Sequence, residues 1–173
     1  LFPEQDIRKT ATNKSFKNRI NIDAIIFASH FNVKEYEMKN FLDYIEIDVF
    51  SGNGGDGIAS FRREKFIPFG GPDGGNGGNG GDIIFVGDKN INSLKNFRNK
   101  RVFKAKNGTK GGSNKKNGKN GDDLEIRVPI GTEVYDKRNN NKIADIITDD
   151  KKIILLKGGK GGLGNTFFKT STN

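Results

Sequence analysis

Apolar and charged residues alternate in the first strongly patterned part of the chain. Ile45, Ile47 and Val49 are separated by Glu46 and Asp48. Successive side chains of a strand point to opposite faces of a sheet, so a period of two predicts a strand with one buried face. We therefore predict a half-buried strand over these residues.

A second alternating segment covers residues 124–130. Leu124, Ile126, Val128 and Ile130 share one face, with Glu125, Arg127 and Pro129 between them. Proline lacks the backbone N–H of a ladder, so this strand is predicted to lie at a sheet edge or to contain a bulge.

Shorter apolar runs complete the set of predicted strands: residues 83–86, 134–135, 143–147 and 153–156. Turn-forming residues separate them at 138–141 and 149–152. Only residues 91–97 suggest a helical turn. Several short strands with little helix predict a mainly β fold, either a barrel or a sandwich.

Glycine divides the chain into two parts. Residues 1–51 contain none, and all 24 glycines lie from Gly52 onward, mostly in the stretches 52–57, 70–81, 108–121 and 158–164. Residues 1–40 are rich in Asn and Lys, with one apolar segment at 25–27. We predict an N-terminal extension over 1–40, largely disordered or derived from a targeting segment, although a helix stays possible and its acidic residues argue against a typical transit peptide.

Within the glycine-rich stretches, glycine recurs every third residue, which is the period of the polyproline II helix. The glycines expected to be structural are Gly71, Gly74, Gly77, Gly80, Gly158, Gly161 and Gly164. A face without side chains lets neighbouring backbones approach closely. Flexible linkers are the usual alternative, but every stretch borders a predicted strand, so we favour a packed bundle. Collagen is disfavoured because the repeat is short and there are only four prolines.

The charge of the chain points to an anionic partner. The 173 residues carry a formal net charge of +9, and nucleic acid and an acidic membrane surface are the candidates. Two basic clusters supply the candidate RNA-binding residues: Arg62, Arg63, Lys65, Lys110, Lys115, Lys116 and Lys119. Such residues contact phosphates, and neighbouring phenylalanines could stack on bases. The alternatives are a solvated run of charge and core phenylalanines, and we expect at least Phe61 in the core.

Catalytic and cofactor motifs are weak or missing in the sequence. There is no cysteine and one histidine, His30, so neither a cysteine nor a histidine metal cluster can form, and no catalytic or metal-binding residue is predicted. G-x-G-x-x-G occurs three times, but without a βαβ unit, and no P-loop is present. No run approaches the roughly 18 apolar residues of a membrane span. We expect no cofactor in this fragment and no enzymatic activity.

The run from Phe61 through Gly75 to Asp82 closely resembles the signature of the Obg domain, the N-terminal module of the Obg family of GTPases. The match extends over residues 51–57, 88–97, 118–123, 128–131 and 158–165, so the resemblance covers about residues 41–173. It implies a bundle of polyproline II helices on a small eight-stranded β-barrel. It also implies a GTPase domain after residue 173, with GTP and Mg²⁺ bound there.

The function implied by the resemblance is non-catalytic docking on the large ribosomal subunit and its rRNA during assembly, with the GTPase domain of the same protein as a second partner. By that analogy, Arg62, Arg63, Lys65 and the segment 110–119 are candidates for rRNA contact. The alternative is a free-standing glycine-bundle module for protein interaction. The extension over 1–40 and the Asn/Lys bias suggest a plastid or mitochondrial matrix, with the bacterial cytoplasm as the alternative.

Overall fold

The computed structural model describes residues 22–28, 44–65 and 70–169. The fold is mainly β, as the alternating patterns predict. The strands are β1 (Ile22–Ala28), β2 (Tyr44–Phe50), β3 (Ile83–Asp88), β4 (Val102–Lys104), β5 (Leu124–Pro129), β6 (Thr132–Asp136), β7 (Asn141–Ile146) and β8 (Lys152–Leu156). Two short 3-10 helices, η2 (Leu94–Phe97) and η3 (Asn165–Phe168), accompany them.

The strands form two sheets, one with the order β4-β2-β1-β6-β7 and one with the order β5-β3-β8. β2 pairs with β4 in parallel, and β3 pairs with β5 in parallel. Within the described residues no ladder joins the two sheets, so the single closed barrel implied by the resemblance is replaced by two sheets that pack on each other.

Most of the predicted inward-facing residues fill the space between the sheets; Ile130 is 37% exposed, because β5 ends at Pro129. Ile45, Ile47 and Val49 of β2 are buried, as are Ile126 and Val128 of β5. Pro129 ends β5 at the edge of its sheet, which confirms the prediction of an edge strand. η2 contributes Leu94 and Phe97 to the same core, so the predicted helical turn is confirmed as a short 3-10 helix.

β1 lies inside the segment that we assigned to an N-terminal extension. It pairs antiparallel with β2 on one side and with β6 on the other, so it is an internal strand of the larger sheet. Residues 22–28 are therefore part of the folded domain, and the helix considered for this segment is wrong. The remainder of the predicted extension lies outside the described residues.

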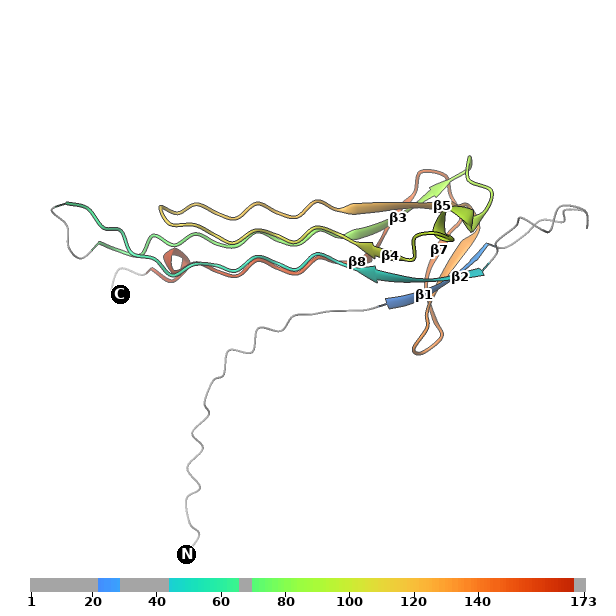
Figure 1. Cartoon of the computed structure of the whole chain (residues 1–173), viewed down its shortest axis with the longest axis horizontal. Coiled ribbons are helices and arrows are strands. Elements are labelled where there is room, and N and C mark those ends of the chain that lie inside the picture. The colour runs from blue at the N-terminus through green and yellow to red at the C-terminus, as the bar shows by residue number, and fades with distance from the viewer. Residues whose placement is uncertain (1–21, 29–43, 66–69, 170–173) are drawn as a thin grey trace, which may run out of the picture.

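Five extended tracts run from one end of the sheets and make the molecule long and narrow (Figure 1). Tract 1 (residues 51–60) follows β2, tract 2 (70–82) precedes β3, and tract 5 (157–164) follows β8. Tract 3 (105–113) follows β4 and tract 4 (115–123) precedes β5, because the third glycine-rich stretch turns back on itself at residues 113–116.

Backbone hydrogen bonds join the tracts to one another at intervals of three residues. The N–H groups of Gly52, Gly55 and Ile58 in tract 1 donate to tract 2, those of Gly77 and Gly80 in tract 2 donate to tract 5, and those of Gly159 and Gly162 in tract 5 donate back to tract 1. Tract 2 also bonds to tracts 3 and 4. The tracts are therefore a packed bundle, and the flexible-linker alternative is wrong for them.

Glycine is required in the bundle because the tracts approach too closely for a side chain. A Cβ atom on Gly80 would lie 2.0 Å from the carbonyl oxygen of Gly52, and one on Gly77 would lie 1.9 Å from that of Gly55. Gly74, Gly158, Gly161 and Gly164 are equally confined by backbone. Gly71 is the exception, because a Cβ there would meet only the Lys169 Nζ atom, 3.8 Å away; the structure gives no steric reason for glycine at that position.

Candidate nucleic-acid interface

Three segments gather at the end of the bundle that lies farthest from the strands (Figure 1). Residues 61–65 continue tract 1 beyond tracts 3, 4 and 5 and begin beside Pro72 of tract 2. Residues 113–116 form the turn between tracts 3 and 4, and η3 closes tract 5. We call this end the tip. All seven predicted RNA-binding residues lie at the tip or on the two tracts that lead to it.

The turn at residues 113–116 has a defined shape. Asn114 and Lys115 adopt positive φ angles of 57° and 56°. Asp73 of tract 2 holds them: its side chain accepts the N–H of Asn114 at 3.2 Å, and its backbone carbonyl accepts the N–H of Lys115 at 2.6 Å. The Ser60 hydroxyl also donates to Asp73, which is only 6% exposed. A buried carboxylate thus fixes the turn to two other tracts.

Lys110, Lys115, Lys116 and Lys119 are exposed on tracts 3 and 4, and none of them forms an ion pair with another described residue. Toward the strands, Lys106 contacts Asp122 at 2.6 Å, and this hydrogen bond lowers the pKa of the Asp122 carboxyl from its usual value. The positive charge of the hairpin is thus neutralised near the sheets and retained toward the tip.

The first basic cluster lies on residues 61–65. Arg62, Arg63 and Lys65 are all exposed, and the guanidinium of Arg62 donates to the carboxylate of Glu64, 2.8 Å from its Nε. Part of this charge is therefore balanced within the segment. Phe61, expected in the core, is 64% exposed; that expectation is wrong because residue 61 pairs with Pro72 of tract 2 but lies beyond the ends of tracts 3, 4 and 5.

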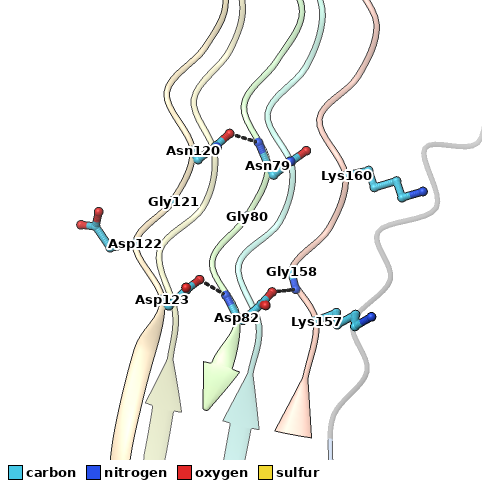
Figure 2. A pocket seen from close by; sticks show the side chains of 10 residues that line it. All are labelled: Asn79, Gly80, Asp82, Asn120, Gly121, Asp122, Asp123, Lys157, Gly158 and Lys160. Carbon is cyan, nitrogen blue, oxygen red and sulfur yellow. Dashed lines mark hydrogen bonds between the residues drawn. The ribbon is translucent and has the colours of Figure 1, made fainter. Parts of the chain in front are cut away.

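A ladder of Asn and Asp side chains across the bundle escaped the sequence analysis. The N–H groups of Asn76, Asn79 and Asp82 in tract 2 donate to the side-chain oxygens of Asn117, Asn120 and Asp123 in tract 4. The side-chain oxygens of the same three tract 2 residues accept the N–H groups of Gly164, Gly161 and Gly158 in tract 5. Figure 2 shows two of these rungs. The signal was present, since Asn or Asp recurs every third residue in register with the glycines.

An open depression of about 570 Å³ follows this ladder close to the strands (Figure 2). Asp82, Asp122 and Asp123 line it together with Lys157 and Lys160 of tract 5, which the sequence analysis did not select. Its mixed charge favours no particular ligand. Among the described residues, no group of three or more His, Cys, Asp or Glu side chains could hold a metal ion.

Exposed phenylalanines were also missed. Phe167 and Phe168 of η3 are 64% and 62% exposed, and their rings meet edge to face with centroids 5.5 Å apart. With Phe61 they place three aromatic side chains at the end of the bundle that carries Lys115 and Lys116, which form no ion pair with described residues. Aromatic side chains beside cations are typical of surfaces that bind single-stranded nucleic acid.

Taken together, these features define a glycine-bundle domain, in which a small β structure carries hydrogen-bonded tracts with a basic, aromatic tip. The chain belongs to the GTP1/OBG family, whose model matches residues 42–173.

Curated relatives of the chain carry the name GTPase Obg. Those of Orientia tsutsugamushi (strain Boryong) and Persephonella marina are 53% and 51% identical over 133 residues, which is 77% of this chain and 40% and 39% of the respective relative. That of Fusobacterium nucleatum is 55% identical over 131 residues, or 76% of this chain and 31% of the relative. The chain therefore matches less than half the length of these relatives. No helix within the described residues is long and apolar enough to cross a membrane.

Proposed function

We propose that this chain is a non-catalytic docking domain that binds rRNA of the large ribosomal subunit through its tip, as part of a GTPase that acts in subunit assembly. The observation that carries the proposal is a set of exposed lysines on tracts 3 and 4 and the turn between them, held on a hydrogen-bonded bundle, that form no ion pair with described residues: Lys110, Lys115, Lys116 and Lys119. Phosphate contacts from lysine supply most of the sequence-independent affinity for nucleic acid.

The rigidity of the bundle supports this role. We infer that the five tracts are left-handed polyproline II helices, because their hydrogen bonds repeat every three residues and run between tracts. Each tract is confined by backbone atoms of its neighbours. A stiff support keeps lysines in fixed positions, so less conformational entropy is lost when they bind.

The GTPase part of the proposal rests on the relatives, which are GTPases by name. GTP and Mg²⁺ would be bound by a segment that these relatives carry outside the matched region. Sequencing the reading frame beyond codon 173 tests this point. A G-x-x-x-x-G-K-[ST] motif in a strand-to-helix context is expected, and a stop codon would favour a free-standing interaction module.

Binding to purified large ribosomal subunits in rising salt tests the docking role. The logarithm of the binding constant should fall by roughly 0.7–0.9 per contacted phosphate for each tenfold rise in salt. The variant K115E/K116E/K119E should bind at least tenfold more weakly, with a shallower salt dependence.

The matched control reverses three exposed cations at the other end of the sheets, Lys95, Arg98 and Lys151, which form no ion pair with described residues. The control has the same net charge as the tip variant. Equal losses in both variants would show that only total charge matters, and the tip would then have no specific role.

We also propose that the protein works in the matrix of a plastid or mitochondrion. Because β1 pairs with both β2 and β6, removal of a targeting segment must leave Ile22 in place. The reading frame from its start codon through residue 21, fused to a fluorescent protein, should direct that protein to the organelle, and a uniformly cytosolic signal would contradict the proposal.

A further inference from the structure

A second, smaller depression lies at the tip between η3 and the turn of tracts 3 and 4. It has a volume of about 230 Å³. Its walls are Phe167, Thr166, Lys115, Asn117 and Asn76, above the glycine backbone of tract 2. It thus combines one exposed aromatic ring, one cation and two carboxamides, and nothing in the comparisons assigns it a ligand.

The ladder fixes which end of each carboxamide is available. The Asn117 Oδ1 atom accepts the N–H of Asn76 at 3.0 Å, and the Asn76 Oδ1 atom accepts the N–H of Gly164 at 2.7 Å. Backbone N–H groups require an oxygen acceptor, so the amide orientation is determined by the network. Both Nδ2 groups lack a hydrogen-bond partner within the described residues. With the Lys115 ammonium, the polar wall offers donors.

The backbone that carries the aromatic wall is held in place by hydrogen bonds. The N–H of Phe167 donates to the carbonyl of Gly164, and that of Thr166 donates to Gly74 of tract 2. The Thr166 hydroxyl also donates to the Gly74 carbonyl at 2.7 Å. The backbone of Phe167 is therefore fixed beside the depression, and most of its side chain is exposed there.

We propose that this depression holds one unstacked guanine of a single-stranded RNA segment, with the Phe167 ring on the face of the base. Guanine presents two adjacent acceptors, N7 and O6, on one edge, whereas adenine presents N7 beside an amino donor. The two amide groups and the ammonium donate to the first pattern and supply no acceptor for the adenine amino group. The Lys115 ammonium then meets the phosphate of the same nucleotide. The proposal rests on the RNA-docking role of the tip and adds base selectivity to it.

The test measures binding of the whole chain to two short single-stranded RNAs, oligoadenylate and the same oligomer with one central guanosine. We expect about tenfold tighter binding of the guanosine oligomer. F167L should weaken its binding by about tenfold, since stacking on an aromatic ring is lost. The control Y44L removes an exposed aromatic ring on β2, away from the tip and outside the depression, and should leave binding within about twofold of the parent.

Asn117→Asp is the sharper variant, because it keeps the ladder and changes only the outward atom. Asp123 already shows that a carboxylate accepts the N–H of its tract 2 partner, at 2.7 Å. The outward donor becomes an acceptor, so the preference for guanosine should disappear. Asn120→Asp makes the same charge change one rung away, outside the depression, and should weaken both oligomers equally while preserving their ratio.

Equal binding of the two oligomers to the parent chain would overturn the proposal, and so would a guanosine preference that survives Asn117→Asp. GMP that binds as tightly as the guanosine oligomer would also overturn it, because the ligand would then be a free nucleotide. Failure of the docking role is separate. It would appear as loss of specific binding to ribosomal subunits while the guanosine preference and its response to Asn117→Asp remain.

Discussion

The backbone N–H of Asn79 donates to the side-chain oxygen of Asn120, 2.8 Å away and 41 residues later in the sequence. The other two rungs between tracts 2 and 4 have the same separation of 41 residues, and so do the parallel strand partners Ile83 and Leu124. Tracts 1 and 3 behave alike: Asn53 and Asn107 are 54 residues apart, as are Asp48 and Val102 in β2 and β4. The strand register therefore continues unchanged into the bundle.

The close approach of the tract backbones makes the glycine positions sensitive to any added atom. G80A would bring a Cβ to within 2.0 Å of the Gly52 carbonyl oxygen. Neither partner can rotate away, because both are backbone. We expect the free energy of unfolding to fall by about 3 kcal/mol, at the upper end for an overpacked site, as measured by urea denaturation.

Gly71 offers the matched control for G80A. A Cβ at this position would meet only the end of the Lys169 side chain, so G71A should change the free energy of unfolding by no more than about 1 kcal/mol. Equal losses in both variants would mean that glycine acts in the tracts through chain flexibility rather than through close packing.

The ladder makes a separate contribution to stability. In N79A the N–H of Gly161 loses its acceptor, the Asn79 side-chain oxygen 2.9 Å away. Because Asn79 is exposed and water can replace the bond, the loss should be about 1 kcal/mol. Amide hydrogen exchange of Gly161 should accelerate, while that of Gly158, one rung away, stays slow.

N79D is the control for this variant, since the carboxylate of Asp82 accepts the N–H of Gly158 at 2.7 Å in the equivalent position. It should keep Gly161 protected. Rapid exchange of Gly161 in N79D would indicate that the carboxamide is needed for a reason other than its oxygen.

The β-strands and the packed tracts could be predicted because their signals are local. Ile45, Ile47 and Val49 show the period of two within five residues, and their burial is confirmed. The period of three in residues 74–80 likewise predicts close approach, which the crowding at Gly74, Gly77 and Gly80 shows.

Features that depend on distant partners could not be predicted. The strand at Ile22–Ala28 carries a short apolar run that fits a helix, a loop or a strand, and its place between β2 and β6 is set by pairing. The exposure of Phe61 depends on where the neighbouring tracts end. The tip depression requires Phe167 and Lys115 to meet across segments that lie far apart in sequence.

The contact between Lys106 and Asp122 predicts a pH effect at the base of the bundle. The hydrogen bond from Lys106 lowers the pKa of the Asp122 carboxyl, so the pair stabilises the fold above the unfolded-state pKa of about 3.9. That contribution is lost as the pH falls through the lower folded-state pKa. Carboxyl NMR should show Asp122 titrating at higher pH in K106Q than in the parent chain; an identical titration would mean that the pair does not form in solution.

A glycine substitution at Lys115 tests whether the residue in this turn contributes to stability or to binding. Its φ angle of 56° lies in the left-handed region, which costs a residue with a side chain roughly 1 kcal/mol and costs glycine nothing. K115G removes this strain but also increases the freedom of the unfolded chain, so the free energy of unfolding should stay within about 1 kcal/mol of the parent.

Binding of K115G to large ribosomal subunits should nevertheless weaken, because an exposed cation is lost. K110A, on tract 3 away from the turn, provides the control for loss of one lysine without a change in φ. A stable K115G chain that binds as well as the parent would show that the strained lysine is not part of the interface.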